Sequence, residues 1–409
     1  MRIMLLSTYY MPDPAANGVL MSYLAEDLAA MGHQVTVVTT FPHYGSGQIQ
    51  PRHRGKLLQR DRQGPVDVYR LYAYASRRKD RVSGRLLNYA TFNALCTVVG
   101  SLVGKQDVVL TPSPPLTNGL VADLIGRLRR IPFVYNVQDI YPDVAIRLGV
   151  LSDPRAIAFF RRMERYVYRR AAALAVISEG FRRNLLSKGV PPEKVSVIPN
   201  FTDTAFVRPL PRHNGFSSQQ GLDHAFVILF AGNMGFSQGL ETVLEAADRL
   251  RDQRDMLFLF VGNGAAKPRL IGCAQELGLE NVRFLPFQPY SMLPEMYAAS
   301  DVGLVPLRQG FAAESVPSKV YTIAAAARPL IAAVDRDSDT HHLVREARCG
   351  LQVEPESAQA LAEAILALYA DQELRETLGR NGRRYVEAHH SREAIARQYA
   401  QLLQEVAGC

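Results

Sequence analysis

The stretch from Glu314 to Ala332, ESVPSKVYTIAAAARPLIA, joins an acid, a short loop and a lysine in an arrangement suited to holding an anion. Pro317 is suited to the first position of a helix, where its missing N–H is not needed. The hydroxyl of Ser315 can accept a hydrogen bond from a free first-turn amide. Lys319 then falls in the first turn of a helix that we expect to end near Ala327.

A lysine in the first turn of a helix opposes the helix dipole. The conflict disappears if an anion is bound there by Lys319 together with free amides such as those of Ser315 and Val316. The alternative is a surface lysine on an ordinary helix. These residues alone do not decide between the two interpretations.

Two glycine-rich turns in the same half of the chain favour a phosphate ligand. Gly232-Asn233-Met234-Gly235 follows the strand-like run Phe226–Ala231, and Gly262-Asn263-Gly264 follows Met256–Val261. Such turns between a strand and a helix let backbone amides approach a phosphate. Each turn is a weak signal, but with residues 315–319 there are three in one region.

The length and charge of the chain indicate two domains and an anionic partner. At 409 residues the chain is too long for one ordinary core. Residues 1–200 contain 27 Lys and Arg against 14 Asp and Glu, a net charge of +13, whereas residues 201–409 contain 20 against 25, a net charge of −5. The basic half predicts binding to phosphates, nucleic acid or an anionic membrane surface.

We expect a cytoplasmic protein, located at the inner face of the cell membrane if it binds lipid. The four cysteines are scattered without a CxxC pair, which favours a reducing compartment. The first apolar run soon meets Pro12 and Asp13, so it reads as a strand rather than a signal peptide. The apolar segment Leu86 to Gly104 includes five polar residues, which favours a core or interfacial helix over a membrane span.

Alternation of strands and helices predicts an α/β fold with two Rossmann-like domains. Arg2–Thr8, Val19–Met31 and Gln34–Thr40 read as a strand, a helix and a strand, which form a parallel βαβ unit. The basic stretch Phe41–Asp67 is expected to be irregular. We predict a first domain over 1–200, a linker over 201–224, a second domain over 225–390, and a helix over 391–409 that packs back towards the first domain.

Asp139 follows the predicted strand Pro132–Val137, within the sequence QDIYPD. A carboxylate just past a parallel strand lies at the edge of the sheet where ligands bind. The alternative is a helix cap or a turn residue. The later helix Pro154–Ala173 carries six arginines among apolar residues, and either an anionic membrane surface or water can face it.

The types of residue favour group transfer from an activated phosphate donor. The sequence shows no evident pair of catalytic carboxylates, Ser-His-Asp set, Walker A loop or metal-ligand spacing. Transfer from such a donor needs mainly positioning and stabilisation of the leaving diphosphate. We therefore expect no metal cofactor.

Taken together, the motifs resemble those of the family-4 retaining glycosyltransferases, which have the GT-B fold. The chain is most similar to bacterial cell-surface polysaccharide enzymes of the colanic-acid and N-acetylfucosaminyltransferase type. The resemblance extends over nearly the whole chain, and its motifs are YYMPDPAANG, GHQVTVVTTFPHY, QDIYPD, VISEGFRRNL, VIPNFTD, AGNMGFSQGLETVLEAA, FVGNG, AASDVGLVPL and ESVPSKVYTIAAAARPLIA.

The resemblance implies that the C-terminal domain binds a nucleotide-sugar, with UDP as the expected nucleotide. Glu314 matches the first acid of the family's Glu-x7-Glu motif, which contacts the donor sugar. Thr322 stands where the second glutamate grips the ribose, and it loses the charged bidentate contact. Asn233 and Gln238 stand where the family has the arginine and lysine that clamp the diphosphate, so we expect Lys319 to take over that role.

Further positions follow from the same resemblance. Asn17 and Gly18 match an N-terminal loop near the phosphates and the acceptor, and Asp139 stands where the family often has a histidine or aspartate near the sugar. The backbone around Phe287 is expected to meet the base. The complete predicted nucleotide-sugar site consists of Asn17, Gly18, Gly232, Asn233, Gln238, Gly262, Asn263, Phe287, Ser315, Val316, Lys319 and Thr322, with Asp139 and Glu314 in catalytic roles.

The implied function is retaining transfer of a sugar to a lipid-linked or glycan acceptor in cell-surface polysaccharide synthesis. Two alternatives remain open. The changes at Asn233, Gln238 and Thr322 are compatible with a non-catalytic partner subunit that binds a nucleotide-sugar, and a nucleotide-sugar epimerase shares the two-domain fold. A nucleic-acid binder is disfavoured, since no aromatic–basic ribbon or known module is present.

Overall fold

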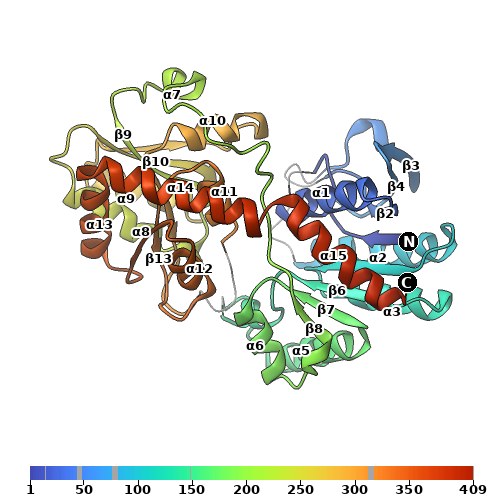
Figure 1. Cartoon of the computed structure of the whole chain (residues 1–409). Helices are drawn as coiled ribbons and strands as arrows, with labels where there is room; N and C mark the ends of the chain where they lie inside the picture. The colour runs from blue at the N-terminus through green and yellow to red at the C-terminus, as the bar shows by residue number, and fades with distance from the viewer. Residues whose placement is uncertain (14, 44–47, 76–81, 148, 312–316, 409) are drawn as a thin grey trace. The chain divides into compact units, whose positions relative to one another are not determined.

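The computed structural model describes the chain except for residues 14, 44–47, 76–81, 148, 312–316 and 409. The chain forms two compact units. The first comprises residues 1–200 together with 392–409, and the second comprises residues 201–391 (Figure 1). Each unit is built around its own sheet, so the predicted α/β class with two Rossmann-like domains is confirmed.

The first unit has an eight-stranded sheet of order β3-β4-β2-β1-β5-β6-β7-β8. Its neighbouring strands are parallel except for β3 and β4, which are antiparallel. The central strands are buried because βαβ connections place helices on both faces. The strands are β1 (Arg2–Leu6), β2 (Gln34–Thr40), β3 (Leu58–Gln63), β4 (Val66–Leu71), β5 (Val108–Ser113), β6 (Phe133–Val137), β7 (Ala173–Val176) and β8 (Val195–Val197).

The helices of the first unit are α1 (Ala16–Ala30), α2 (Val82–Leu102), α3 (Thr117–Arg129), α4 (Asp143–Arg147), α5 (Pro154–Arg170), α6 (Glu179–Ser187) and α15 (Arg392–Ala407), with the short 3-10 turns η1 (Pro51–His53) and η2 (Pro192–Lys194). Helix α2 covers the apolar segment noted above. It packs on α3 and β2 and buries Phe92 and Cys96. No helix in the described part of the chain combines the length and apolar character needed to cross a membrane.

The last helix, α15, packs on α1, β5 and β6 of the first unit. Its first residue, Arg392, bonds the carboxylate of Asp27 at 2.7 Å and lies over the ring of Tyr23 at 4.0 Å. Further along, Tyr399 is buried and its hydroxyl accepts a hydrogen bond from Asn136 of β6 at 2.6 Å. A helix that follows the second unit in sequence is thus part of the core of the first.

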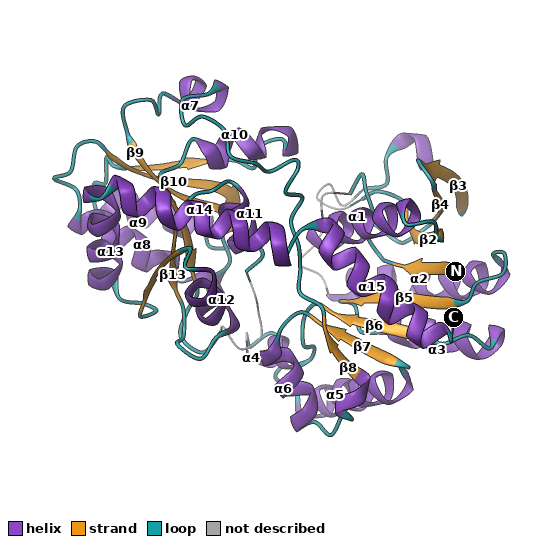
Figure 2. Cartoon of the chain, viewed as in Figure 1, coloured by secondary structure: helices purple, strands orange, loops and turns teal. Residues whose placement is uncertain are grey.

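The second unit has a six-stranded parallel sheet of order β11-β10-β9-β12-β13-β14. Figure 2 shows its strands flanked by helices, and the buried apolar residues form two clusters, so both faces are covered. The strands are β9 (Phe226–Asn233), β10 (Met256–Asn263), β11 (Val282–Leu285), β12 (Val302–Pro306), β13 (Leu330–Ala333) and β14 (Gly350–Val353).

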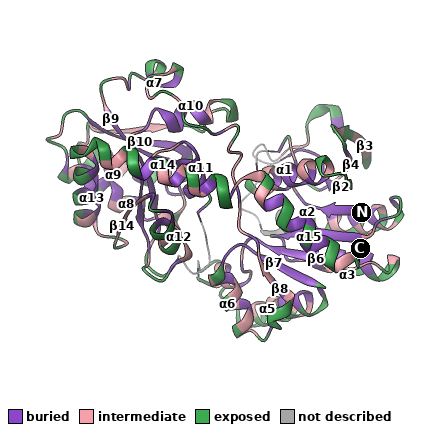
Figure 3. Ribbon diagram, in the orientation of Figure 1, coloured by how far each residue is buried: buried purple, intermediate pink, exposed green. Residues whose placement is uncertain are grey.

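The helices of the second unit are α7 (Gly215–Gln220), α8 (Leu240–Arg249), α9 (Lys267–Glu276), α10 (Leu293–Ala298), α11 (Lys319–Ala325), α12 (Asp339–Ala347), α13 (Ala358–Ala370) and α14 (Gln372–His389), with the 3-10 turns η3 (Phe236–Gln238) and η4 (Tyr290–Met292). In Figure 3 the strands are largely purple, and green exposed residues lie along the outer sides of the helices. This pattern is the expected one for helices that cover a sheet.

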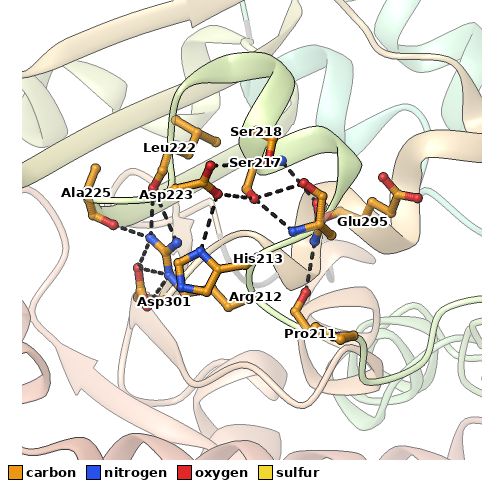
Figure 4. A network of polar contacts seen from close by, with 11 residues as sticks. Pro211, Arg212, His213, Ser217, Ser218, Leu222, Asp223, Ala225, Glu295 and Asp301 are labelled. Carbon is orange, nitrogen blue, oxygen red and sulfur yellow. Dashed lines mark hydrogen bonds and ion pairs between the residues drawn. The ribbon is translucent and has the colours of Figure 1, made fainter.

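The segment 201–224 is not a free linker, contrary to the prediction from its prolines and glycines. It forms helix α7 and buries Val207, Phe216 and Leu222 in the core of the second unit. Figure 4 shows how its polar residues are held: Arg212 ion-pairs with Asp301 at 3.0 Å. The guanidinium of Arg212 also bonds the carbonyls of Leu222 and Ala225. Turn-forming residues predicted a loop here, but buried apolar side chains fix it to the domain.

A smaller expectation, that the stretch 41–67 is irregular, is also corrected. The stretch 41–67 contains β3, which pairs with β4 at the edge of the first sheet. The strand was not predicted because its side chains are mostly charged or polar. An edge strand can carry such residues, since it leaves alternate side chains in water. Gln238, one of the predicted site residues, lies in η3, and α8 begins at Leu240 after Gly239 with its positive φ of 58°.

Candidate active site

The glycine-rich turns of the second unit meet at the carboxyl edge of its sheet. β9 and β10 are paired to their last residues, with Gly232 opposite Gly262 and Asn233 opposite Asn263. Gly262 has a φ of 143°, and a Cβ atom there would lie 2.0 Å from the carbonyl oxygen of Gly232. Glycine is therefore required at this position, because the two strands approach more closely than any side chain allows.

Lys319 lies against this pair of turns. Its half-buried side chain places Nζ 2.8 Å from Oε1 of Gln238 and 3.8 Å from the centre of the Phe230 ring. A Cβ atom built on Gly232 would be 3.9 Å from the same Nζ. Burial lowers the pKa of Lys319 to about 7, because removal from water disfavours the charged amine.

Other cations at this edge are already engaged. The Nζ of Lys267, in the first turn of α9, donates to the carbonyls of Gly262 at 2.8 Å and Leu285 at 2.9 Å. Arg308, which follows β12, ion-pairs with Glu241 at 3.1 Å. Lys319 pairs with no carboxylate in the described part of the chain, so its charge is available to a ligand.

Sequence reasoning did not assign Lys267, which holds the second glycine turn in place. The sequence did contain a signal for Lys267, since this lysine comes a few residues after the glycines of the second turn. Like Lys319, it begins a helix. What could not be read from the sequence is the direction of its side chain. It turns back onto backbone carbonyls rather than towards a ligand.

The remaining predicted residues of the second unit are placed as follows. Asn233 and Asn263 are exposed at the ends of their strands, and the Asn263 side chain accepts from the Gly264 amide at 2.9 Å. Thr322 lies one turn after Lys319 on α11 and is half-buried. Phe287, which follows β11, is 61% exposed. Glu314, Ser315 and Val316 lie outside the described residues.

A separate polar cluster lies at the carboxyl edge of the first sheet. The Asn17 side chain, in the first turn of α1, donates to the carbonyl of Ser113 at 3.2 Å. The Ser113 hydroxyl, at the end of β5, bonds the Asp139 carbonyl at 3.3 Å and accepts from the Gln138 amide at 3.2 Å. The structure thus brings together Asn17 and Asp139, which are far apart in sequence. Ser113 joins them and was not foreseen.

Asp139 has the properties of a group that meets a ligand. It is half-buried, and its carboxylate has no hydrogen-bond or ion-pair partner within the described residues. Burial raises its pKa to about 6. Unpaired buried carboxylates are costly and are common where they face a substrate.

Side-chain amides extend this cluster into the protein. Gln138 donates to Asn136 at 2.8 Å and accepts from Asn200 at 2.8 Å, and Asn136 donates to Tyr399 of α15. These residues are buried or half-buried, so the chain of hydrogen bonds fixes the end of β6. Asp139 therefore follows a rigid strand end.

Gly18 positions the loop after β1. A Cβ atom there would lie 3.1 Å from the carbonyl carbon of Tyr9. The carbonyl of Gly18 accepts from the Ser22 hydroxyl at 2.7 Å, and that hydroxyl accepts from the Met11 amide at 2.9 Å. Close packing therefore holds this loop beside Asn17. Among the described residues, no group of three or more His, Cys, Asp or Glu side chains is placed to hold a metal ion.

Comparison with known proteins identifies the family. The Glycosyl transferase 4-like domain matches residues 18–200, and Glycosyl transferases group 1 matches residues 216–385. WcaI of Escherichia coli K12, assigned as a colanic acid biosynthesis glycosyl transferase, is 30% identical over 379 residues, or 89% of this chain and 91% of WcaI.

Solved structures show the same fold. Sucrose-phosphate synthase from Thermosynechococcus elongatus has a TM-score of 0.78 at 21% identity and covers 100% of both chains. Anabaena HepE, solved in complex with UDP-glucose, has a TM-score of 0.72 at 18% identity and covers 99% of this chain and 100% of its own. The fold is therefore GT-B. The family resemblance inferred from the motifs is confirmed, and the chain belongs to the group 1, family-4 retaining glycosyltransferases.

Proposed function

We propose that this enzyme transfers a sugar from a UDP-sugar to a lipid-linked or glycan acceptor in the synthesis of a cell-surface polysaccharide. The name of WcaI supports the pathway, and the UDP-glucose complex of HepE supports the donor. In this proposal the second unit binds the donor and the first unit binds the acceptor. The protein acts in the cytoplasm, at the inner face of the membrane.

The observation that carries the donor site is the position of Lys319. Its ammonium group lies beside two glycine-rich strand ends, and Gln238 is its one hydrogen-bond partner among the described residues. A diphosphate at this point would receive a charge-assisted hydrogen bond from the lysine and bonds from free amides. We propose that the amides of Ser315 and Val316 contribute, and that Glu314 contacts the sugar.

Lys319 would also assist the chemical step. When the bond between sugar and phosphate breaks, the departing UDP gains negative charge, and a nearby ammonium group stabilises that charge. Because the enzyme retains the anomeric configuration, we propose that a leaving phosphate oxygen accepts the proton of the acceptor hydroxyl. No metal is needed if Lys319 and backbone amides hold the diphosphate.

We assign Asp139 to the acceptor side of the reaction. Its carboxylate has no described partner, and Asn17 and Ser113 hold the neighbouring backbone. With a pKa of about 6, it is mostly ionised at neutral pH and can accept a hydrogen bond from an acceptor hydroxyl. Its role in the proposal is to orient that hydroxyl.

A thermal-shift experiment tests the donor assignment. UDP, GDP, ADP, dTDP and CMP are added separately to the purified protein, since a ligand that binds only the folded state raises its melting temperature. We expect a shift with UDP. Lys319→Ala should weaken UDP binding about 30-fold or more, because a partly buried charge pair is lost, whereas Lys319→Arg should weaken it less.

Lys56→Ala is a matched control, since its Nζ forms an exposed hydrogen bond with Gln59 in the other unit. An unchanged UDP affinity in Lys319→Ala would contradict the assignment of this lysine. A shift with GDP in place of UDP would contradict the predicted nucleotide and leave the lysine assignment intact.

A further inference from the structure

A second basic site is present on the first unit, in an open pocket between α5 and the connection from α6 to β8. The pocket has a volume of about 760 Å³, within the range of small-ligand sites. Its lining includes five cationic side chains and no carboxylate: Arg162, Arg165, Arg169, Lys188 and Lys194.

The two lysines are occupied. Lys188 ion-pairs with Glu164 at 2.6 Å and with Asp143 at 2.7 Å. Lys194 donates to the carbonyls of Arg169 and Ala171 at 3.0 and 2.9 Å, which satisfies the carboxyl end of α5. The two lysines therefore stabilise the walls of the pocket, and their ammonium groups already have partners in the protein.

The three arginines are not occupied. They are exposed, and none forms an ion pair or hydrogen bond through its guanidinium with any residue that the structure describes. Their spacing of three and four residues places them on one face of α5, while Glu164, Val167 and Tyr168 face the core. Three like charges side by side repel one another, so an anion bound between them would be favoured.

The location separates this pocket from the candidate active site. Arg169 and Lys194 lie just before β7 and β8 begin, whereas Ser113 is the last residue of β5 and Asp139 follows β6. The strands are parallel, so these are opposite edges of one sheet. The pocket is therefore not part of the polar cluster assigned to the acceptor.

An exposed apolar side chain on the same helix indicates what kind of anion the pocket binds. Phe159, which lies three residues before Arg162 on α5, is 59% exposed. A basic helix with protruding apolar residues is typical of a segment that lies on an anionic membrane surface.

We propose that this pocket binds the phosphate group of an anionic phospholipid and so docks the first unit on a membrane surface. The inference deepens the membrane contact that forms part of the proposed function. It does not depend on which sugar or nucleotide the enzyme uses.

Flotation with lipid vesicles tests the proposal, using the full-length protein. One set of vesicles contains phosphatidylglycerol mixed with phosphatidylcholine, and the other contains phosphatidylcholine alone. We expect binding to the first set only, and weaker binding at higher salt. The triple variant Arg162→Gln, Arg165→Gln and Arg169→Gln should bind about 100-fold more weakly, because each arginine near an anionic surface contributes about five-fold.

A matched triple variant controls for net charge. Arg336→Gln, Arg380→Gln and Arg397→Gln removes the same charge from side chains that are 80%, 62% and 71% exposed in ordinary surface ion pairs. It should bind vesicles nearly as well as the unmodified protein. The UDP thermal shift is measured on every variant, so loss of vesicle binding is distinguished from misfolding and from failure of the donor assignment.

Three results would overturn the proposal. The first is equal vesicle binding by the two triple variants. The second is equal binding of the unmodified protein to both sets of vesicles. The third is no vesicle binding at all while pyrophosphate or a single-stranded oligonucleotide binds in a way that depends on the three arginines.

Discussion

Each candidate site lies at the carboxyl edge of the sheet of its own unit, but the two sites are formed by different chemical groups. In the second unit the turns at Gly232 and Gly262 bring backbone against backbone, and a single lysine supplies the charge. In the first unit the edge is formed by side-chain amides, hydroxyls and the carboxylate of Asp139. Backbone amides suit a diphosphate that is the same in every donor, whereas side chains suit an acceptor whose hydroxyls must be told apart.

The largest expected effect comes from a substitution at Gly262, which disrupts the close backbone approach in the second unit. In Gly262→Ala the new Cβ would lie 2.0 Å from the carbonyl oxygen of Gly232, so β9 and β10 must separate. We expect a loss of about 3 kcal/mol or more in the stability of the second unit, with loss of UDP binding. Hydrogen exchange should show faster exchange in β9 and β10 and unchanged protection in β5 and β6.

Gly272→Ala is the control for this prediction. A Cβ atom there meets nothing within 4 Å, and the residue lies inside α9. Alanine in a helix is favoured over glycine by about 1 kcal/mol, so this variant should be slightly more stable. Equal stability of the two variants would show that the close approach of β9 and β10 at Gly262 does not contribute to the stability of the second unit.

The second prediction separates acceptor chemistry from donor binding. Asp139→Asn should lower kcat about 100-fold, because misplacing a reacting group by about 1 Å costs a factor of that order. The UDP thermal shift should not change. In the unmodified enzyme the rate should fall as the pH decreases through about 6, because protonation of Asp139 removes the carboxylate.

Asp67→Asn serves as a control, since that carboxylate is 41% exposed and pairs with Arg60 on an edge strand. Its kcat should stay close to that of the unmodified enzyme. A weakened UDP shift in Asp139→Asn, with kcat unchanged, would reverse the roles assigned to the two units.

The backbone geometry around Lys319, at the proposed donor site, was partly predictable because glycines and prolines at the ends of strands and helices are visible in the sequence. Glycines at the ends of apolar runs predicted the turns at 232–235 and 262–264, and Pro317 indicated the start of the helix that carries Lys319. The sequence did not reveal that Lys267 bonds two carbonyls while Lys319 points to Gln238. Both lysines begin a helix, and only the fold decides what each side chain meets.

The polar contacts at the carboxyl edge of the first sheet were harder to predict. Asp139 was selected as a candidate because it follows a predicted strand, but Ser113, Gln138 and Tyr399 have no distinctive sequence pattern. Their interactions join residues up to 263 positions apart, and only tertiary packing creates them. The segment 201–224 was misread for a similar reason, because its turn residues are visible in the sequence but the burial of Phe216 and the pairing of Arg212 are not.

A third prediction concerns pH and the lysine. The pKa of Lys319 is lowered to about 7, from about 10.5 in the unfolded chain, so between these values the unfolded chain binds the extra proton. Stability of the free protein should therefore rise with pH through this window. A bound diphosphate favours the charged amine, so UDP affinity should fall as pH increases, by up to about ten-fold per unit between about pH 7.5 and about pH 9.

Lys319→Arg tests whether deprotonation of Lys319 causes the pH dependence of UDP affinity, since arginine stays protonated throughout this pH range. Titration calorimetry in two buffers of different ionisation enthalpy should show proton uptake on UDP binding in the unmodified protein and none in this variant. The same proton uptake in both proteins would assign the effect to another group.

The smallest expected effect concerns the buried hydrogen bonds that support the strand end before Asp139. Tyr399→Phe removes the hydroxyl that accepts from Asn136 at 2.6 Å, and both residues are buried. The loss should be about 1 kcal/mol, because the Asn136 amide keeps only a longer bond to the Ala175 carbonyl at 3.4 Å. Tyr369→Phe in the second unit removes an exposed bond to Asp255 and should cost less. If the two variants lose equal stability while UDP binding is unchanged, the polar chain behind Asp139 does not stiffen the first unit, and the contrast between the two sites reduces to the lysine and the glycines.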